Sequence, residues 1–115
     1  MVSHLSKKLN TAILYVEYSL APEFPFPYAN NQILALYKEL KRKYPNHKFV
    51  IMGDSAGAGL ALALVDNIQK SGLSLPNSLA LISPWIDLKC INPSFVTRQA
   101  SARLAVYQYY FKSSN

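Results

Sequence analysis

The sequence is poor in the residues that bind metal ions or form disulfides. It has one cysteine, Cys90, and two histidines, His4 and His47, which lie far apart along the chain. A single cysteine excludes a disulfide within the chain and favours a reducing compartment, such as the cytoplasm, over an oxidising one. A zinc site needs several such ligands at short, regular spacings. We therefore expect no bound metal ion and interpret Cys90 as an ordinary thiol.

Charged residues and long apolar runs are also scarce. Only 16% of the residues are charged and 50% are hydrophobic, which favours one packed domain over a disordered chain. No apolar run approaches the roughly 18 residues that span a bilayer, so we expect no transmembrane segment. Lys7 and Lys8 precede an apolar stretch, as in a signal peptide. However, Glu17 interrupts this stretch and no small-residue cleavage site follows, which argues against that interpretation.

The net charge of +6 comes mainly from scattered lysines and arginines. Their one tight cluster, residues 38–43, falls at the end of a predicted helix, where cations interact favourably with the helix dipole and usually form a solvated face. The sequence has no nucleic-acid-binding signature with interleaved aromatic residues. Phosphate-cradling and dinucleotide-binding motifs are absent as well. We therefore expect no nucleic-acid partner and no cofactor, and the sequence does not specify an oligomeric state.

Strands and helices alternate along the first half of the chain. Residues 11–18 are nearly continuously apolar and rich in β-branched and aromatic types, which is typical of a buried parallel strand. The proline-rich residues 19–27 predict an extended loop, because proline cannot continue a ladder or a helix. In residues 29–44 apolar side chains recur at three- and four-residue steps. This spacing predicts an amphipathic helix that Pro45 ends.

The second half continues the alternation. Residues 48–52 and 78–82 read as short strands, and residues 56–70 between them are apolar nearly all round, which predicts a buried helix. Strands that alternate with helices build a parallel sheet with right-handed crossovers. We therefore expect an α/β fold of three layers, with about three parallel strands and crossover helices. Residues 101–111 predict a further helix with an aromatic end.

A short motif lies between the second predicted strand and the buried helix. Gly53-x-Ser55-x-Gly57 in this context places the serine in a strained turn, so that its hydroxyl projects from the edge of the sheet. Small flanking residues let strand and helix approach closely. The backbone amide of Ala56 then points toward a developing oxyanion, and the helix N-terminus adds positive potential there. Ser55 is the candidate nucleophile, and Asp54 completes the turn. The alternative is a glycine-rich turn without chemistry.

Three segments resemble motifs of the hormone-sensitive-lipase-like esterases, which have the α/β-hydrolase fold. Residues 18–27 read Tyr-Ser-Leu-Ala-Pro-Glu-Phe-Pro-Phe-Pro and resemble the family's Y-x-L-A-P-E-x-P-F-P segment. Residues 53–57, Gly-Asp-Ser-Ala-Gly, match its nucleophile elbow. Residues 81–88 read Leu-Ile-Ser-Pro-Trp-Ile-Asp-Leu and resemble its L-x-S-P-W-x-D-L strand end. The order and spacings match over residues 11–88. The family also includes fungal steryl acetyl hydrolases.

The resemblance implies hydrolysis of a small carboxylic ester, such as a short acyl ester or a steryl acetate, by a serine nucleophile. Ser55 matches that nucleophile, and the Ala56 amide matches one oxyanion donor. Asp54 matches an elbow position outside the triad, and Asp87 matches a structural position rather than the catalytic acid. Ala58 stands where the family usually has glycine, a change that we expect to crowd the elbow slightly. No metal ion or cofactor is implied.

Several parts of the family's machinery have no counterpart in the sequence. The family's His-Gly-Gly-Gly oxyanion loop, expected well before Tyr18, is missing. The triad order in this fold is serine, acid, histidine, and no histidine follows Ser55. His47 precedes the strand that leads to Ser55, so we expect it at the opposite end of the sheet. We expect neither His47 nor His4 to act as the base.

The triad acid and histidine are therefore expected to be missing from the chain. We expect residues 1–115 to form a single, incomplete α/β-hydrolase domain, a truncated piece of a hydrolase that is weak or inactive by itself. Residues 94–115 would begin a cap or the following helix. The alternative is a non-catalytic relative that binds an acyl or sterol-like ligand or another chain. A patatin-like or acyltransferase domain shares the elbow, but residues 18–27 and 81–88 count against it.

Overall fold

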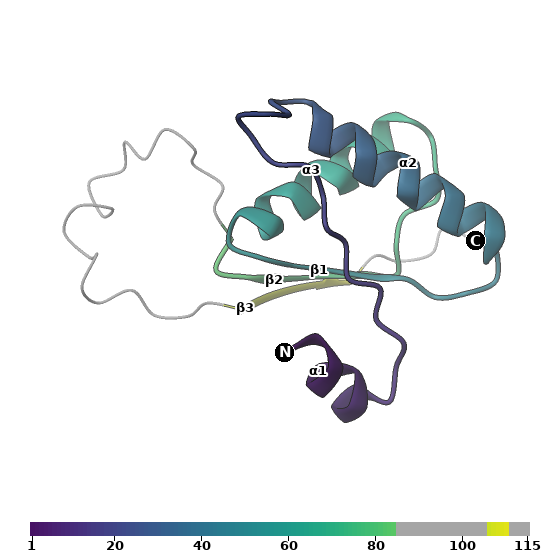
Figure 1. Ribbon diagram of the computed structural model, residues 1–115. Helices are drawn as coiled ribbons and strands as arrows, with labels where there is room; N and C mark the ends of the chain where they lie inside the picture. The colour runs from purple at the N-terminus through teal and green to yellow at the C-terminus, as the bar shows by residue number, and fades with distance from the viewer. Residues whose placement is uncertain (85–105, 111–115) are drawn as a thin grey trace, which may run out of the picture.

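The computed structural model describes residues 1–84 and 106–110 as one sheet flanked by helices (Figure 1). The elements, in chain order, are helix α1 (Val2–Leu9), helix α2 (Tyr28–Lys43), strand β1 (Val50–Asp54), helix α3 (Ala56–Lys70), strand β2 (Ser78–Ile82) and strand β3 (Val106–Tyr110). The strand order is β1-β2-β3, with β1 and β2 parallel and β3 antiparallel to β2. Helices α2 and α3 lie over one face of the sheet and α1 lies on the other side. The predicted α/β class and the incomplete parallel core are confirmed.

Helix α3 packs against both α2 and the sheet, so it contributes to two adjoining clusters of buried side chains. On the sheet side, Ala58 and Ala61 pack with Leu79 and Leu81 of β2. The small alanines allow the helix backbone to lie close to the strands. On the other side, Leu64 and Ile68 pack with Ile33 and Tyr37 of α2. This arrangement accounts for the nearly all-round apolar sequence of α3, which we predicted with the same bounds.

The register of β1 and β2 brings their carboxyl ends to the same edge of the sheet. Asp54 pairs with Ile82, and the pairing continues back to Val50 and Ser78. Alternate residues face α3, so Leu79 and Leu81 are buried. On the opposite face, Val50 and Met52 keep 62% and 47% of their surface exposed. The edge that leads into α3 is therefore the place where residues 55 and 83 become neighbours.

The strand predicted for residues 11–18 is wrong. This segment is irregular and mostly exposed, although Val16 and Tyr18 pack against the cluster between α2 and α3. Its apolar composition indicated a buried, extended segment. However, a strand also needs a hydrogen-bonding partner for its backbone, and the sheet of the described residues consists of β1, β2 and β3. Composition cannot show whether such a partner is at hand.

The chain's C-terminal prediction also needs correction. We expected a helix over residues 101–111, but Val106–Tyr110 forms strand β3 and pairs with β2. Valine and tyrosine favour strands, and β2 has a second edge available for pairing. The other residues of the predicted helix lie outside the described part of the chain, as do Asp87 and Cys90.

Two smaller differences concern the remaining elements. Strand β1 lies slightly closer to Ser55 than the predicted residues 48–52, whereas β2 has its predicted bounds. Helix α1 was not predicted. It ends at Asn10, whose left-handed φ of 46° is typical of a helix C-terminus, and Lys7 and Lys8 occupy its last turn. Within the described residues, no helix is both long enough and apolar enough to cross a bilayer.

One buried hydrogen bond makes the stability of the core dependent on pH. The Tyr37 hydroxyl on α2 donates to the Ser74 carbonyl at 2.7 Å, and the side chain is buried. Burial raises the pKa of Tyr37 above its ordinary value. The folded state therefore holds this proton more tightly than the unfolded state does. The stabilisation is complete below about pH 10 and is lost as the pH rises through the folded pKa.

Replacing Tyr37 with phenylalanine should therefore have a pH-dependent effect. We expect Tyr37→Phe to lower the free energy of unfolding by about 1 kcal/mol at pH 7, because the Ser74 carbonyl loses its donor. The difference between the variant and the wild type should shrink above about pH 10, where the unfolded wild-type chain releases this proton while the folded chain still holds it. Urea unfolding at pH 7 and at alkaline pH measures both values. A difference that stays constant over this range would contradict the explanation.

Candidate active site

Ser55 is the single residue between β1 and α3, and its backbone conformation is unusual. It has φ 54° and ψ −116°, a region that residues with a side chain rarely adopt. Its amide donates to the Ile82 carbonyl at 2.9 Å, which extends the pairing of β1 with β2 by one bond. Its carbonyl accepts from the amides of Ala58 and Gly59 at 3.1 and 3.3 Å. The strained conformation is thus fixed by hydrogen bonds on both sides of the residue.

Gly53 allows the end of β1 to approach the start of α3. A Cβ atom at Gly53 would lie 2.3 Å from the Gly57 carbonyl oxygen and 2.7 Å from the Ala58 Cα, both of which are backbone atoms. No side chain fits there unless the helix moves away from the strand. At Gly57, by contrast, a Cβ atom would meet no atom of the described residues within 4 Å. The tight turn around Ser55 therefore depends on Gly53, and position 57 has room for a methyl group.

Ala58 is part of the core. It stands where the esterases whose motifs this sequence resembles usually have glycine. It is fully buried and packs with Ala61, Leu79 and Leu81 where α3 crosses β2. The methyl group that we expected to crowd the elbow therefore fills the interface between helix and sheet. Ala58 also contributes the amide that donates to the Ser55 carbonyl, so it supports the turn directly.

The start of α3 presents a positive electrostatic potential beside Ser55. The first amides of a helix have no acceptor within the helix and carry its positive partial charge. The first turn of α3 contains no acidic residue to cancel this charge. Two of the early amides donate to the Ser55 carbonyl, whereas the amide of Ala56, an exposed residue, has no such partner in the described part of the chain. This amide is available to an anionic oxygen formed at Ser55.

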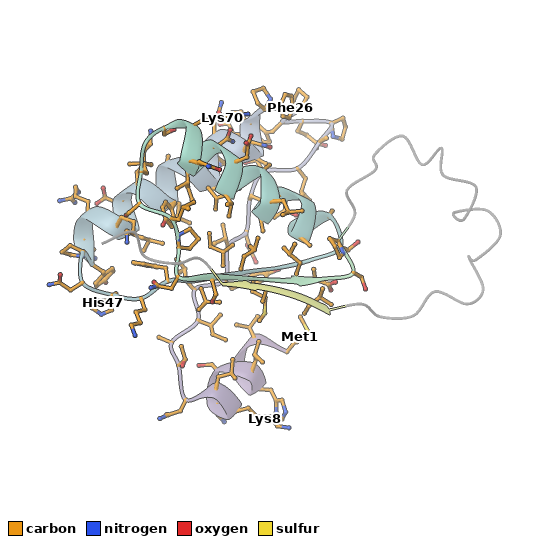
Figure 2. The ribbon with its side chains drawn as sticks, turned by 180° about the vertical axis from the view of Figure 1, so that it is seen from behind. Met1, Lys8, Phe26, His47 and Lys70 are labelled. Carbon is orange, nitrogen blue, oxygen red and sulfur yellow. The ribbon has the colours of Figure 1, made fainter. Side chains whose placement is uncertain are left out.

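Neither histidine is brought to Ser55. His47 is exposed, and its ring centroid lies 5.1 Å from that of Tyr44 in a tilted contact. His47 precedes β1, so it lies at the opposite end of the strand from Ser55 (Figure 2). His4 lies on α1, on the other side of the sheet from α3. In residues 1–84 the Ser55 hydroxyl forms no capping bond and has no hydrogen-bonded base. The described residues also contain no cluster of three or more potential metal ligands.

Apolar side chains gather in the loop before α2. Leu20 and Phe26 keep 64% and 84% of their surface exposed, and the Phe24 ring contacts the Tyr28 ring in a tilted arrangement with 4.7 Å between their centroids. The amide of Ser19 donates to the Gln32 side chain at 2.9 Å, which ties the start of the loop to α2. The loop lies at the same end of the molecule as the turn from β1 to α3 (Figure 1). It can therefore present apolar surface on the side of Ser55.

Sequence reasoning missed one feature at this edge. Ser83, directly after β2, also has a positive φ, of 44°. The only signal in the sequence was its position between a strand and Pro84. A proline ends the ladder, but it does not predict a left-handed residue before it.

The chain is similar in sequence and structure to known hydrolases. Residues 1–113 match the sequence profile of the alpha/beta hydrolase fold. An acetyl-hydrolase of Streptomyces hygroscopicus is 40% identical over 102 residues, which are 84% of this chain and 34% of that protein. The structure of EstE5 soaked with p-nitrophenyl butyrate is 42% identical with a TM-score of 0.79, over 86% of this chain and 34% of that one.

A further solved structure carries the family name that the sequence motifs suggested. An esterase from the bacterial hormone-sensitive lipase family is 32% identical with a TM-score of 0.78. The matched part is 84% of this chain and 33% of that one. The chain thus spans about a third of the length of these relatives.

Proposed function

We propose that this chain, which belongs to the alpha/beta hydrolase fold family, carries the nucleophile of a carboxylic-ester hydrolase. The proposed nucleophile is Ser55. The observation that supports the proposal most is the left-handed conformation of Ser55 at the junction of β1 and α3. Strained residues that are held by their surroundings cluster at functional sites. Relatives that are an acetyl-hydrolase and esterases support the same class of reaction.

The proposed reaction has two steps. The Ser55 Oγ attacks the ester carbonyl carbon and gives its proton to a general base, which passes it to the departing alkoxide. The bond between the carbonyl carbon and the alcohol oxygen breaks, and an acyl-serine remains. Water then adds to this acyl group, and the carboxylic acid and the free serine are released. In both steps the Ala56 amide would donate to the oxyanion of the tetrahedral intermediate.

The substrate we propose is a small ester with a short acyl group. The name of the acetyl-hydrolase relative supports an acetyl or similarly short group. The apolar loop with Leu20, Phe24 and Phe26 offers surface for an apolar substrate at the end of the molecule where Ser55 lies.

The isolated chain should be a weak catalyst, because no histidine reaches Ser55 in the described residues. We propose that the base, the acid and a second oxyanion donor come from polypeptide other than residues 1–115. Serine hydrolases that lose triad members keep about 10³- to 10⁴-fold acceleration over water from the oxyanion hole and substrate binding. We expect the chain alone to accelerate ester hydrolysis by no more than this factor over the reaction in water.

Histidine variants test this division of labour. We expect His47→Ala and His4→Ala to hydrolyse p-nitrophenyl acetate within about twofold of the wild-type rate, since neither imidazole lies near the Ser55 hydroxyl. Circular dichroism would establish that each variant is folded. A fall of tenfold or more in a folded His47→Ala chain would show that this residue acts as the base.

The same missing base favours one alternative. A non-catalytic relative would bind an acyl or sterol-like ligand through the apolar loop and would not need the Ser55 hydroxyl. In that case Ser55→Ala would leave ligand binding unchanged, while Phe26→Ser, which removes an 84% exposed aromatic ring, would weaken it. Fluorescence titration with a short fatty acid distinguishes this function from ester hydrolysis.

A further inference from the structure

Two of the left-handed residues in this structure lie side by side at the proposed site. Among the described residues that are not glycine, only Asn10, Ser55 and Ser83 have a positive φ. Asn10 ends helix α1, a place where asparagine often adopts this conformation. Ser55 and Ser83 instead follow the last residues of β1 and β2, which pair with each other in the sheet. Their φ angles are 54° and 44°.

A hydrogen bond couples the two serines. The Ser55 amide donates to the carbonyl of Ile82 at 2.9 Å, and that carbonyl belongs to the peptide group that joins Ile82 to Ser83. This peptide group is held on one side by β2 and on the other by the backbone of Ser83. With an extended residue at position 83 the chain would continue in the direction of β2. The positive φ of Ser83 instead ends the strand. The Ile82 carbonyl is therefore the last carbonyl of β2 that accepts a hydrogen bond from this side of the sheet, and its donor is the Ser55 amide.

Among the described residues, no side-chain partner of Ser83 accounts for its conformation. Within residues 1–84 its hydroxyl forms no hydrogen bond. Pro84 follows directly, and a proline further restricts the backbone of the residue before it. A positive φ costs free energy for a residue with a Cβ atom and persists only where the surroundings enforce it. The contribution of Ser83 therefore lies in its backbone.

We propose that Ser83 is a positioning residue for Ser55. Its left-handed backbone holds the Ile82 carbonyl against the Ser55 amide, and this bond helps to keep Ser55 at a φ of 54°, with its hydroxyl clear of the sheet. If the Ile82–Ser83 peptide rotates, the Ser55 amide loses its acceptor. Ser55 can then relax toward negative φ and carry its hydroxyl and the Ala56 amide out of place. The catalytic meaning of this coupling rests on the proposed function, but the coupling itself does not.

Four substitutions at position 83 separate backbone from side chain. Ser83→Gly and Ser83→Asn tolerate a positive φ, whereas Ser83→Val, which is β-branched, disfavours it strongly and Ser83→Ala disfavours it mildly. The matched control is Asn10→Val, which places the same β-branched side chain at a positive φ of 46° on α1, away from Ser55. Ser83→Ala serves as the decisive variant if Ser83→Val does not fold.

Two measurements on the folded chain report the effect. The first is hydrogen exchange of the Ser55 amide by NMR, relative to the amides of Leu64 and Ile68 in the core of α3. The second is the rate at which a fluorophosphonate labels Ser55. We expect Ser83→Val to raise the relative exchange rate and to lower the labelling rate, each by about tenfold, the factor that corresponds to strain at one such residue. The glycine and asparagine variants and Asn10→Val should stay near the wild type.

The outcomes distinguish this inference from the proposed function. Equal relative exchange of the Ser55 amide in the wild type and in the valine or alanine variant would overturn the role of Ser83. So would a rise in exchange shared equally by Ser55, Leu64 and Ile68, because that would show a loss of overall stability only. A folded wild-type chain whose Ser55 is never labelled would contradict the proposed function, and the exchange data would still decide on Ser83.

Discussion

Replacing Ser55 with alanine should abolish covalent labelling by a fluorophosphonate and lower the rate of p-nitrophenyl acetate hydrolysis. The strained turn places Ser55 at the positive end of α3, where the Ala56 amide has no hydrogen-bond acceptor among the described residues. The probe bonds to the serine oxygen, so the alanine variant has no group at position 55 to label. The loss of hydrolysis should be smaller than in a complete serine hydrolase, because the residual acceleration that comes from the oxyanion hole and substrate binding does not need the serine. Gel fluorescence with the probe and absorbance of p-nitrophenolate measure the two losses.

The control for this prediction is a serine in an ordinary conformation. Ser71, at the C-terminus of α3, is exposed and has a φ of −82°. Ser71→Ala should leave labelling and hydrolysis at the wild-type rates, because nothing around its hydroxyl activates it. Equal losses in Ser71→Ala and Ser55→Ala would show nonspecific reaction of surface serines.

The pH dependence should also differ from that of a complete serine esterase. A histidine base produces an inflection in the labelling rate near its own pKa, at about pH 6.5. No histidine lies beside Ser55 in the described residues, so the labelling rate should rise steadily with hydroxide concentration and show no inflection there. An inflection in that range would show that a histidine reaches the serine.

Adding a single methyl group at Gly53 should be the most damaging change to the fold. Its Cβ atom would lie 2.3 Å from the Gly57 carbonyl oxygen, so β1 and α3 must separate. That separation would also open the packing of Ala58 against β2. We expect Gly53→Ala to lower the free energy of unfolding by about 3 kcal/mol or more, a large share of the 5–15 kcal/mol typical of a domain.

Gly57→Ala provides the matched comparison. The same methyl group meets no atom of the described residues within 4 Å, and alanine is the better helix former. We expect this variant to be unchanged or more stable by about 0.5–1 kcal/mol. Urea unfolding followed by circular dichroism compares both variants with the wild type. A Gly53→Ala chain within about 1 kcal/mol of the wild type would contradict the close approach described at this turn.

The elements that sequence reasoning located best are those with strong local signals. Helix α3 is apolar on nearly every side, and β2 is a short apolar run that ends at Ser83 and Pro84. Residues 11–18 have an equally apolar composition but form no strand, because pairing depends on a neighbour that composition does not reveal. Residues 106–110 were misassigned for a related reason, since their pairing with distant β2 outweighs any local helical tendency.

The candidate site was partly predictable in the same sense. Three fixed residues between a strand and a helix are enough to single out Ser55. The sequence did not distinguish the two flanking glycines, although only Gly53 faces backbone atoms that exclude a side chain. Nor did it indicate the left-handed Ser83, because the coupling of Ser83 to Ser55 arises from the register of β1 and β2. Local motifs predict local geometry, and tertiary contacts decide the rest.

The most direct test of the proposed nucleophile is to locate the fluorophosphonate adduct on the folded wild-type chain by tandem mass spectrometry. The structure predicts one slow adduct, on Ser55, whose yield increases with pH. Adducts spread over the exposed serines, or a folded chain without an adduct on Ser55, would contradict the proposal that this residue is the nucleophile of an ester hydrolase.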